Sequence, residues 1–193
     1  MEKHVSLSTK RRALTGTTMT ALFGALIAAG AFISIPLPFS PVPVVLQNMF
    51  AMLSGLVLGP LLGGAAAALY LIAGALGAPV FAGATGGIAH FFGPTGGFLI
   101  GYLLASLTAG FIAGRPRADR KTSWVRIILG TGLGLLAVYL PGVIHLKAVL
   151  NTSWAGALAA GFIPFIIGDV VKGVVAALIA PRLRRVAADQ LDG

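Results

Sequence analysis

The chain of 193 residues contains no cysteine and only 5 acidic residues. Without cysteine, neither a disulfide framework nor a thiolate metal site is possible. Charged residues make up 10% of the chain, whereas a soluble domain carries about 25%. The chain also lacks any G-x-x-x-x-G-K-[ST] motif, which excludes nucleotide binding by a P-loop. The shortage of charged residues excludes an ordinary soluble domain, because too few are present to cover a water-facing surface.

Long hydrophobic runs take the place of the missing charge. Hydrophobic residues make up 57% of the chain, and the mean hydropathy is +0.95. A helix of roughly 20 apolar residues crosses a bilayer. The runs therefore predict an integral membrane protein that forms a single membrane domain over residues 1–193. They cover 13–35, 44–77, 97–114, 124–144 and 161–181.

The 14 basic residues raise the net charge to +9, and most of them lie in three clusters. The clusters occupy residues 3–12, 115–126 and 182–185, each next to a hydrophobic run. Basic flanks mark the cytoplasmic side of a membrane protein, where anionic lipid headgroups also attract them. The charge therefore predicts membrane orientation rather than nucleic-acid binding.

If all three clusters are cytoplasmic, an even number of spans must separate each from the next. This parity predicts an all-α bundle of six transmembrane helices over residues 13–183, with both termini cytoplasmic. Residues 1–12 form the basic N-terminus and 184–193 a C-terminal tail. A short interfacial helix is expected at 151–161, before a final helix that starts near Pro164. The expected spans are 13–34, 44–59, 61–77, 97–114, 124–146 and 163–183.

Two loops on the outer side are unusual. Residues 33–48, "ISIPLPFSPVPVVLQN", contain four prolines and cannot form a continuous helix. Residues 74–97 are rich in glycine and too long for a simple hairpin turn. Irregular backbone near membrane depth is tolerated only where it is buried in protein or lines a cavity. The two loops therefore predict a lidded pocket that opens to the outside.

The motif "GDVVKG" places Asp169 and Lys172 on one face of the last predicted span. An ionisable residue inside a membrane is costly and usually faces the bundle, where it often binds ligand. We therefore expect the carboxylate to accept N–H donors from a ligand and the ammonium to donate to a carbonyl or carboxylate. The alternative is a structural ion pair that satisfies itself.

Other polar and aromatic positions allow two interpretations each. Gln47 and Asn48 either cap a helix at the interface or contact a ligand. Phe81, with its phenylalanine neighbours in the glycine-rich loop, either lines a ligand cavity or fills the core of a lid. Thr95 is expected to be the N-cap of the fourth span. His90 has no second ligand at metal-binding spacing, so no metal site is predicted.

Small residues recur every four positions on the first predicted helix, at Ala21, Ala25 and Ala29. Such a stripe lets two helices approach closely. In a glycine-rich membrane protein, the spacing usually reflects internal packing.

Four stretches together resemble the BioY family, the biotin-specific substrate-binding (S) components of energy-coupling-factor (ECF) vitamin transporters. The resemblance extends from about residue 13 to residue 185, with the motifs in the family's order and spacing. The stretches are "PVPVVLQNMFAMLSGLVLGPLLG" (41–63), "GALGAPVFAGATGG" (74–87), "FGPTGGFLIGYLLA" (92–105) and "FIPFIIGDVVKGVVAALIAPRL" (162–183).

The resemblance implies a multi-pass protein of a prokaryotic plasma membrane that captures biotin from outside with high affinity. It implies no enzymatic activity and no cofactor. The family's D-x-x-K motif, which contacts the ligand's polar groups, falls on Asp169 and Lys172. Many relatives have a polar residue in or just after the "PVF" loop where this chain has residues 82–84, which leaves His90 or Lys147 as possible substitutes. The further expected ligand contacts are Gln47, Phe81, Gly83, Thr95 and Gly96.

The resemblance also assigns a role to the alanine stripe. S components dock through such a surface against a transmembrane coupling (T) protein, which two cytoplasmic ATPases drive. Ala21, Ala25 and Ala29 match that surface. The first alternative is a stand-alone, oligomeric biotin facilitator without ATPase partners. The second is an intramembrane enzyme that uses Asp169 as acid or base, although it lacks a second catalytic group.

Overall fold

The computed structural model describes residues 2–119 and 121–192, with side chains described for 12–119 and 121–191. Most of the basic cluster at 3–12, and Arg120 of the second cluster, therefore lie outside the described side chains. The first helix, α1 (Glu2–Ala29), ends five residues before the predicted end of its span at residue 34. Directly after this end, Gly30 lies against the start of the next long helix, where a Cβ atom would be 2.9 Å from the Gln47 nitrogen.

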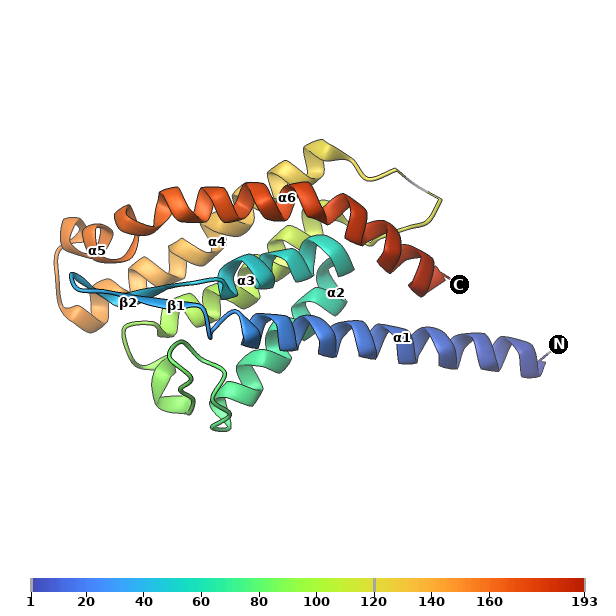
Figure 1. Cartoon of the computed structure of the whole chain (residues 1–193), viewed down its shortest axis with the longest axis horizontal. Coiled ribbons are helices and arrows are strands. Elements are labelled where there is room, and N and C mark those ends of the chain that lie inside the picture. The colour runs from blue at the N-terminus through green and yellow to red at the C-terminus, as the bar shows by residue number, and fades with distance from the viewer. Residues whose placement is uncertain (1, 120, 193) are drawn as a thin grey trace.

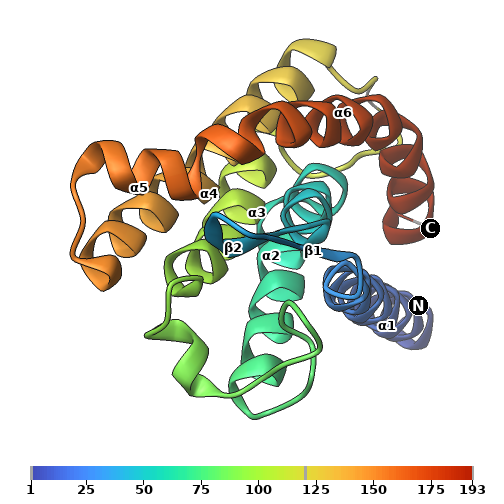
Figure 2. The same ribbon diagram turned by 60° about the vertical axis from the view of Figure 1, so that its left-hand side comes forward.

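Four helices of the described residues are long and apolar enough to cross a membrane: α2 (Gln47–Ala75), α3 (Gly96–Ala113), α4 (Trp124–Leu150) and α6 (Ile163–Asp192). A one-turn helix, η1 (Ile88–Phe91), interrupts the glycine-rich loop. The N-terminal end of α1 and the C-terminal end of α6 lie at the same end of the molecule (Figure 1). Figure 2 shows the same grouping from a second direction.

The proline-rich loop forms a β-hairpin, so the prediction of an all-α fold is wrong at this segment. Strand β1 (Ser34–Leu37) pairs antiparallel with β2 (Ser40–Val45), and Ser34 lies opposite Val45. The register shifts between Ile35 and Leu37, where Pro36 has no N–H to donate. Two strands without further neighbours tolerate prolines because half of their ladder groups face outward.

The predicted second and third spans are the two halves of α2, which bends sharply at Gly59 and Pro60. Gly59 has a φ of +81°, a value that L side chains rarely adopt, and Pro60 provides no helical N–H. The second half folds back on the first, since a Cβ atom on Gly63 would lie 2.6 Å from both the Ser54 oxygen and the Gly55 Cα. The predicted Gly-Pro turn is thus present as a kink within α2.

Close backbone approach at glycine also joins α2 to α3. A Cβ atom on Gly55 would lie 1.9 Å from the carbonyl oxygen of Ser106, so the two helices meet without an intervening side chain. The Ser54 and Ser106 hydroxyls, 2.9 Å apart, form a buried hydrogen bond at the same crossing. Small residues thus allow α2 and α3 to pack closely at the centre of the bundle, as in other membrane proteins.

Gly55→Ala is therefore expected to lower the free energy of unfolding by about 2 kcal/mol or more, since the added methyl group overlaps a backbone atom. Gly132→Ala is the matched control, because the Gly132 Cβ position on α4 has no atom within 4 Å. Thermal unfolding in detergent measures both. Equal melting temperatures for the two variants would contradict the tight crossing.

The last part of the chain follows the prediction more closely. The short helix expected at 151–161 is α5 (Trp154–Gly161), and α6 begins at Ile163, one residue before Pro164. Proline is accommodated there because the first helical N–H groups need no intrahelical acceptor. Helix α6 continues to Asp192, so the predicted tail from residue 184 belongs to the same helix. Pro181 lies inside α6 and does not end it.

Candidate functional site

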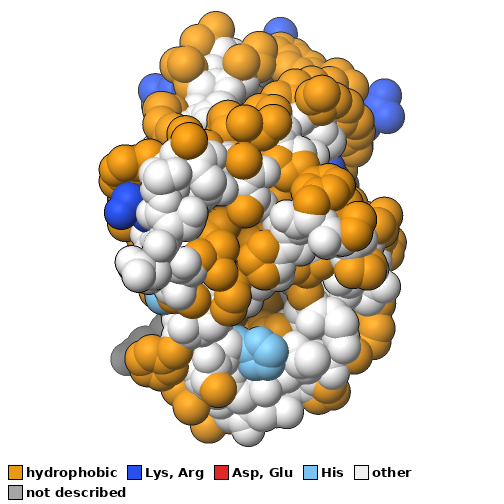
Figure 3. Space-filling view, turned by 90° about the vertical axis from the view of Figure 1, so that its left-hand side faces the viewer, with side chains coloured by type: hydrophobic (Ala, Val, Ile, Leu, Met, Phe, Trp, Pro, Cys, Tyr) orange, Lys and Arg blue, Asp and Glu red, His pale blue; other side chains and the backbone are white. Residues whose placement is uncertain are grey.

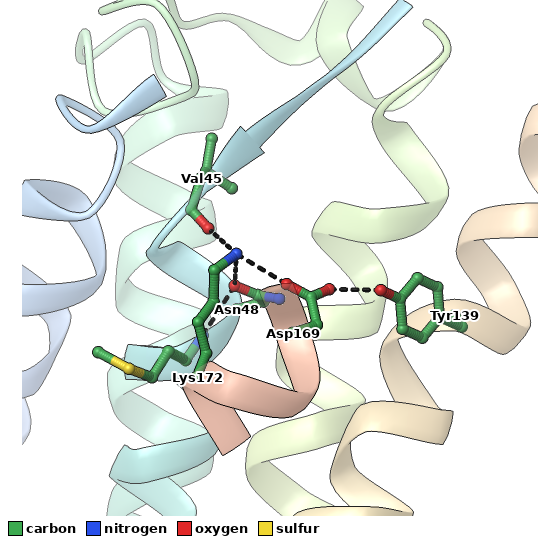
Figure 4. Close-up of polar contacts among 6 residues, drawn as sticks. Val45, Asn48, Tyr139, Asp169 and Lys172 are labelled. Carbon is green, nitrogen blue, oxygen red and sulfur yellow. Dashed lines mark hydrogen bonds and ion pairs between the residues drawn. The ribbon is translucent and has the colours of Figure 1, made fainter. Parts of the chain in front are cut away.

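Asp169 and Lys172 form an ion pair inside the bundle, one turn apart on α6. The Lys172 Nζ atom lies 2.7 Å from Asp169 Oδ1, and the two side chains are 12% and 6% exposed. Figure 4 shows the pair where α6 faces the start of α2. A buried ion pair needs further hydrogen bonds to offset the cost of removing both charges from water.

Neighbouring elements supply those hydrogen bonds. Lys172 donates to the Val45 carbonyl oxygen at 2.6 Å and lies 3.5 Å from Asn48 Oδ1, while the Tyr139 hydroxyl donates to Asp169 Oδ2 at 2.5 Å. All three ammonium hydrogens therefore have acceptors (Figure 4). The carboxylate accepts on both oxygens and retains further lone pairs for a ligand.

None of these three partners was predicted to contact the ion pair. Tyr139 lies on α4 within an apolar run, and only the packing of α4 against α6 brings it to Asp169. The only sequence signal was a tyrosine in the middle of a predicted span. Asn48, expected either to cap a helix or to contact a ligand, lies beside Lys172 and accepts from the Met49 N–H at 3.0 Å.

A cavity of about 610 Å³ lies beneath the hairpin and the glycine-rich loop. Its volume is within the range of small-molecule sites. Figure 3 shows this end of the molecule as a largely hydrophobic face on which no acidic side chain is visible. The expected contacts Gln47, Phe81, Gly83 and Thr95 all line this cavity.

The ion pair lines a second, much smaller cavity of about 30 Å³, together with Asn48 and Tyr139. The two cavities share walls formed by the second strand of the hairpin and by α3. The shared residues are Val42, Pro43, Val45, Phe98 and Tyr102. The expected site residues that line a cavity thus fall into two adjacent groups rather than into one pocket. The five shared residues form the partition between the two cavities.

Gln47 lies at the first position of α2 and is 1% exposed. Its side-chain nitrogen donates to the Tyr70 hydroxyl at 2.6 Å and to the Val80 carbonyl at 3.0 Å. It makes no side-chain cap, because it bonds instead to α2's far half and to the glycine-rich loop. Gln47 therefore fixes that loop over the cavity.

Phe81 fits both interpretations of its position, since it fills the core of the loop and also lines the cavity. It is 2% exposed and makes edge-to-face contacts with the rings of Tyr70, His90 and Phe91 at 5.5–5.9 Å between centroids. A Cβ atom on Gly74 would lie 2.2 Å from the same ring, so α2 approaches it closely. Phe81 thus forms the centre of the loop's own core and also part of the cavity wall.

Gly83 lies in a tight turn over the cavity, where Phe81 and Thr85 exchange backbone hydrogen bonds. Its φ of +74° and the φ of +56° at Ala84 are left-handed. Thr95 is the N-cap of α3 by position, but its side chain makes no capping hydrogen bond. Gly96 does not line the cavity: a Cβ atom there would lie 2.0 Å from the Phe91 oxygen, so this glycine allows close packing.

The two suggested substitutes for a polar loop residue lie in different places. His90 lines the larger cavity, whereas the Lys147 ammonium lies 5.1 Å from the centre of the Trp154 ring. That contact is a cation–π interaction. His145 contacts the Gly93 oxygen through Nε2 at 3.0 Å and so joins α4 to the loop. Within residues 12–119 and 121–191, whose side chains are described, no three His, Asp or Glu side chains gather to hold a metal.

Apolar helices of membrane-spanning length, a ligand-sized cavity and a buried ion pair beside it define a membrane protein built to enclose a small molecule. The comparison with known proteins makes this specific. The chain belongs to the BioY family, which it matches over residues 1–189.

Its relatives are transporters and not enzymes. The probable biotin transporter BioY of Pyrococcus horikoshii is 44% identical over 167 residues, covering 86% of this chain and 94% of the relative. The biotin transporter BioY of Thermotoga maritima is 41% identical over 169 residues, covering 88% and 95%. The crystal structure of an S-component for biotin from an ECF-type ABC transporter matches with a TM-score of 0.80 and 32% identity, covering 90% of this chain and 92% of that one.

Proposed function

We propose that this chain captures biotin at the outer face of a prokaryotic plasma membrane and serves as the S component of an ECF importer. The observation that carries the proposal is the buried Asp169–Lys172 pair beside a cavity of about 610 Å³ in a BioY-family chain. Biotin is the cargo here, and no cofactor is required. The six-span topology with cytoplasmic termini belongs to the same proposal, supported by the basic clusters and the fold-back of α2.

The chemistry of the pair suits the polar end of biotin. The ureido ring offers two N–H donors, for which the carboxylate of Asp169 has unused lone pairs. It also offers one carbonyl oxygen, to which the ammonium of Lys172 would donate in place of Val45 or Asn48. Phe81, Phe98 and the turn at Gly83 present apolar walls to the rest of the ligand. Opening the partition between the two cavities would let the ligand reach both groups.

Equilibrium binding of radiolabelled biotin to the purified chain in detergent tests the capture function. We expect a Kd below about 1 µM, which corresponds to about 8 kcal/mol of binding free energy. An analogue without the ureido ring should bind far more weakly, because the buried ion pair would lose its partner. Well-folded protein that binds no biotin would overturn the assignment.

The alanine stripe on α1 supports the proposed partnership with a T protein. Ala21, Ala25 and Ala29 are all exposed and lie on the face of α1 opposite its buried residues. This face is free of large side chains at those positions, as close helix packing requires. Transport would then depend on the T protein and its two ATPases, since the chain has no nucleotide-binding motif of its own.

Ala25→Trp is expected to reduce biotin uptake at least about tenfold in cells that carry the T protein and ATPases, because the indole blocks close helix contact. Biotin binding to the purified variant should not change. Ala148→Trp, at another exposed alanine, on α4, is the matched control. Uptake that persists after deletion of the ATPases would instead favour the stand-alone facilitator, as would uptake that Ala25→Trp leaves unchanged.

A further inference from the structure

A third cavity, of about 830 Å³, lies at the end of the molecule opposite the hairpin. The connection between α3 and α4, the start of α4 and the last turns of α6 enclose it. The N-terminal end of α1 and the C-terminal end of α6 lie at this same end of the molecule (Figure 1). The biotin proposal assigns no role to this cavity.

The lining of this cavity is strongly cationic. Six basic side chains line it, against the two carboxylates Asp119 and Asp189. Among the described residues, neither carboxylate forms an ion pair with any of the six. The charge is therefore not neutralised from within the described part of the chain. The six are Arg115, Arg117, Lys121, Arg126, Arg184 and Arg185.

Two of the guanidinium groups converge on one backbone position. Arg184 is 6% exposed and donates from Nη2 to the Gly114 oxygen at 3.1 Å. A Cβ atom on Gly114 would lie only 3.7 Å from Arg126 Nη1. Within the described residues, the Arg184 Nε atom is buried and has no hydrogen-bond partner. Like charges this close favour an anion between or beside them.

The start of α4 adds further donors. Thr122 and Ser123 line the cavity, and Ser123, the N-cap of α4, makes no side-chain cap. The first N–H groups of a long helix and its dipole favour an anion, and phosphate in particular. Guanidinium groups bind phosphate oxygens in a matching bidentate geometry. The chemistry of the cavity is thus that of a phosphate site.

Apolar surface beside the cavity identifies the source of the phosphate. Trp124, Val125 and Ile128, in the first turns of α4, are 52–65% exposed, and Val186 of α6 is 55% exposed. Where basic and apolar surfaces meet in this way, the phosphate and the acyl chains of one lipid can contact both, whereas a soluble anion can contact only the basic side chains. Tryptophan is also typical of the headgroup level of a membrane.

We propose that this cavity binds the headgroup of an anionic phospholipid, with its phosphate among Arg115, Arg126 and Arg185 and its acyl chains along the first turns of α4. The bound lipid neutralises the cationic lining and joins the α3–α4 connection to α6. Basic pockets between helices on the cytoplasmic side are suited to such headgroups.

Native mass spectrometry of the full chain, released from mixed phosphatidylglycerol and phosphatidylcholine nanodiscs, tests this proposal. The wild-type chain should retain phosphatidylglycerol. The double variant Arg126→Gln/Arg185→Gln should retain about 30-fold less, since two basic residues near a membrane surface contribute about 1 kcal/mol each. Arg182→Gln removes an equally exposed charge of α6 that does not line the cavity, and it should retain as much as wild type.

Three results would overturn the proposal. Equal retention by all three proteins would mean that lipid binds elsewhere, and equal loss in Arg182→Gln would mean that only diffuse surface charge attracts it. Displacement of the lipid by millimolar inorganic phosphate would identify a free anion as the ligand. If the double variant does not fold, Arg117→Gln/Lys121→Gln on the exposed connection replaces it, with the same expectations.

Discussion

Asp169→Asn is expected to weaken biotin binding at least about 100-fold, which corresponds to a loss of roughly 3 kcal/mol. The substitution keeps the shape of the side chain but replaces one acceptor oxygen by an NH₂ group, which would face the N–H donors of the ureido ring. It also removes the negative charge that holds Lys172 at 2.7 Å. Equilibrium biotin binding in detergent measures the loss.

The conservative control is Asp189→Asn, which removes an exposed carboxylate of the same helix far from the ion pair. A folding defect is separated from a binding defect by the double variant Asp169→Asn/Lys172→Gln, which leaves no unpaired buried charge. We expect this double variant to remain folded without binding biotin. Wild-type affinity in both Asp169 variants would make the ion pair purely structural and leave the BioY membership intact.

Arg184→Met should destabilise the chain by about 3 kcal/mol or more, since several hydrogen bonds from a charged donor are lost at once. The Arg184 guanidinium donates to the Leu56 oxygen and, at 3.1–3.3 Å, to the oxygens of Ala113, Gly114 and Arg115. It thereby binds the carbonyl ends of the first half of α2 and of α3, where helix dipoles favour a cation. In thermal unfolding, we expect a melting temperature about 10 °C lower.

Arg182→Met is the matched control, because Arg182 is exposed on the same helix and makes none of these contacts. Its melting temperature should stay close to that of wild type, as for other surface substitutions. If Arg182→Met and Arg184→Met have the same melting temperature, the buried guanidinium does not stabilise the helix ends. Biotin affinity of the folded Arg184→Met protein should be unchanged, because the ligand cavity lies at the other end.

Several features of the fold could be predicted from local patterns. Apolar run length located the four membrane-length helices, and the Gly-Pro pair located the bend in α2. The four prolines of residues 33–48 correctly excluded a helix but did not reveal a hairpin. Strand pairing depends on partners elsewhere in the chain, here on the register of Ser34 with Val45. For the same reason, the end of α1 was placed five residues too late.

At the site, the ion pair could be predicted from the sequence, but its hydrogen-bond partners could not. An aspartate and a lysine one turn apart in an apolar segment had to face the bundle, because exposure to lipid would be costly. Which groups complete the pair is a matter of packing: Tyr139 comes from α4 and Val45 from the hairpin. Neither residue carries a local signal of that role.

Composition and the length of the apolar runs were sufficient for the membrane class and for the position of the ionisable pair, because both depend on the chemistry of consecutive residues against a lipid environment. The family was indicated by the resemblance of four motifs to those of BioY proteins. Two features depended on contacts between distant segments: the closure of the ion pair by Tyr139 and the burial of Arg184. Arg184 was predicted to lie in a charged tail and is instead buried against two helix ends. The difference arises because the local sequence determines which groups must avoid lipid, whereas only the packed bundle determines which partners they meet.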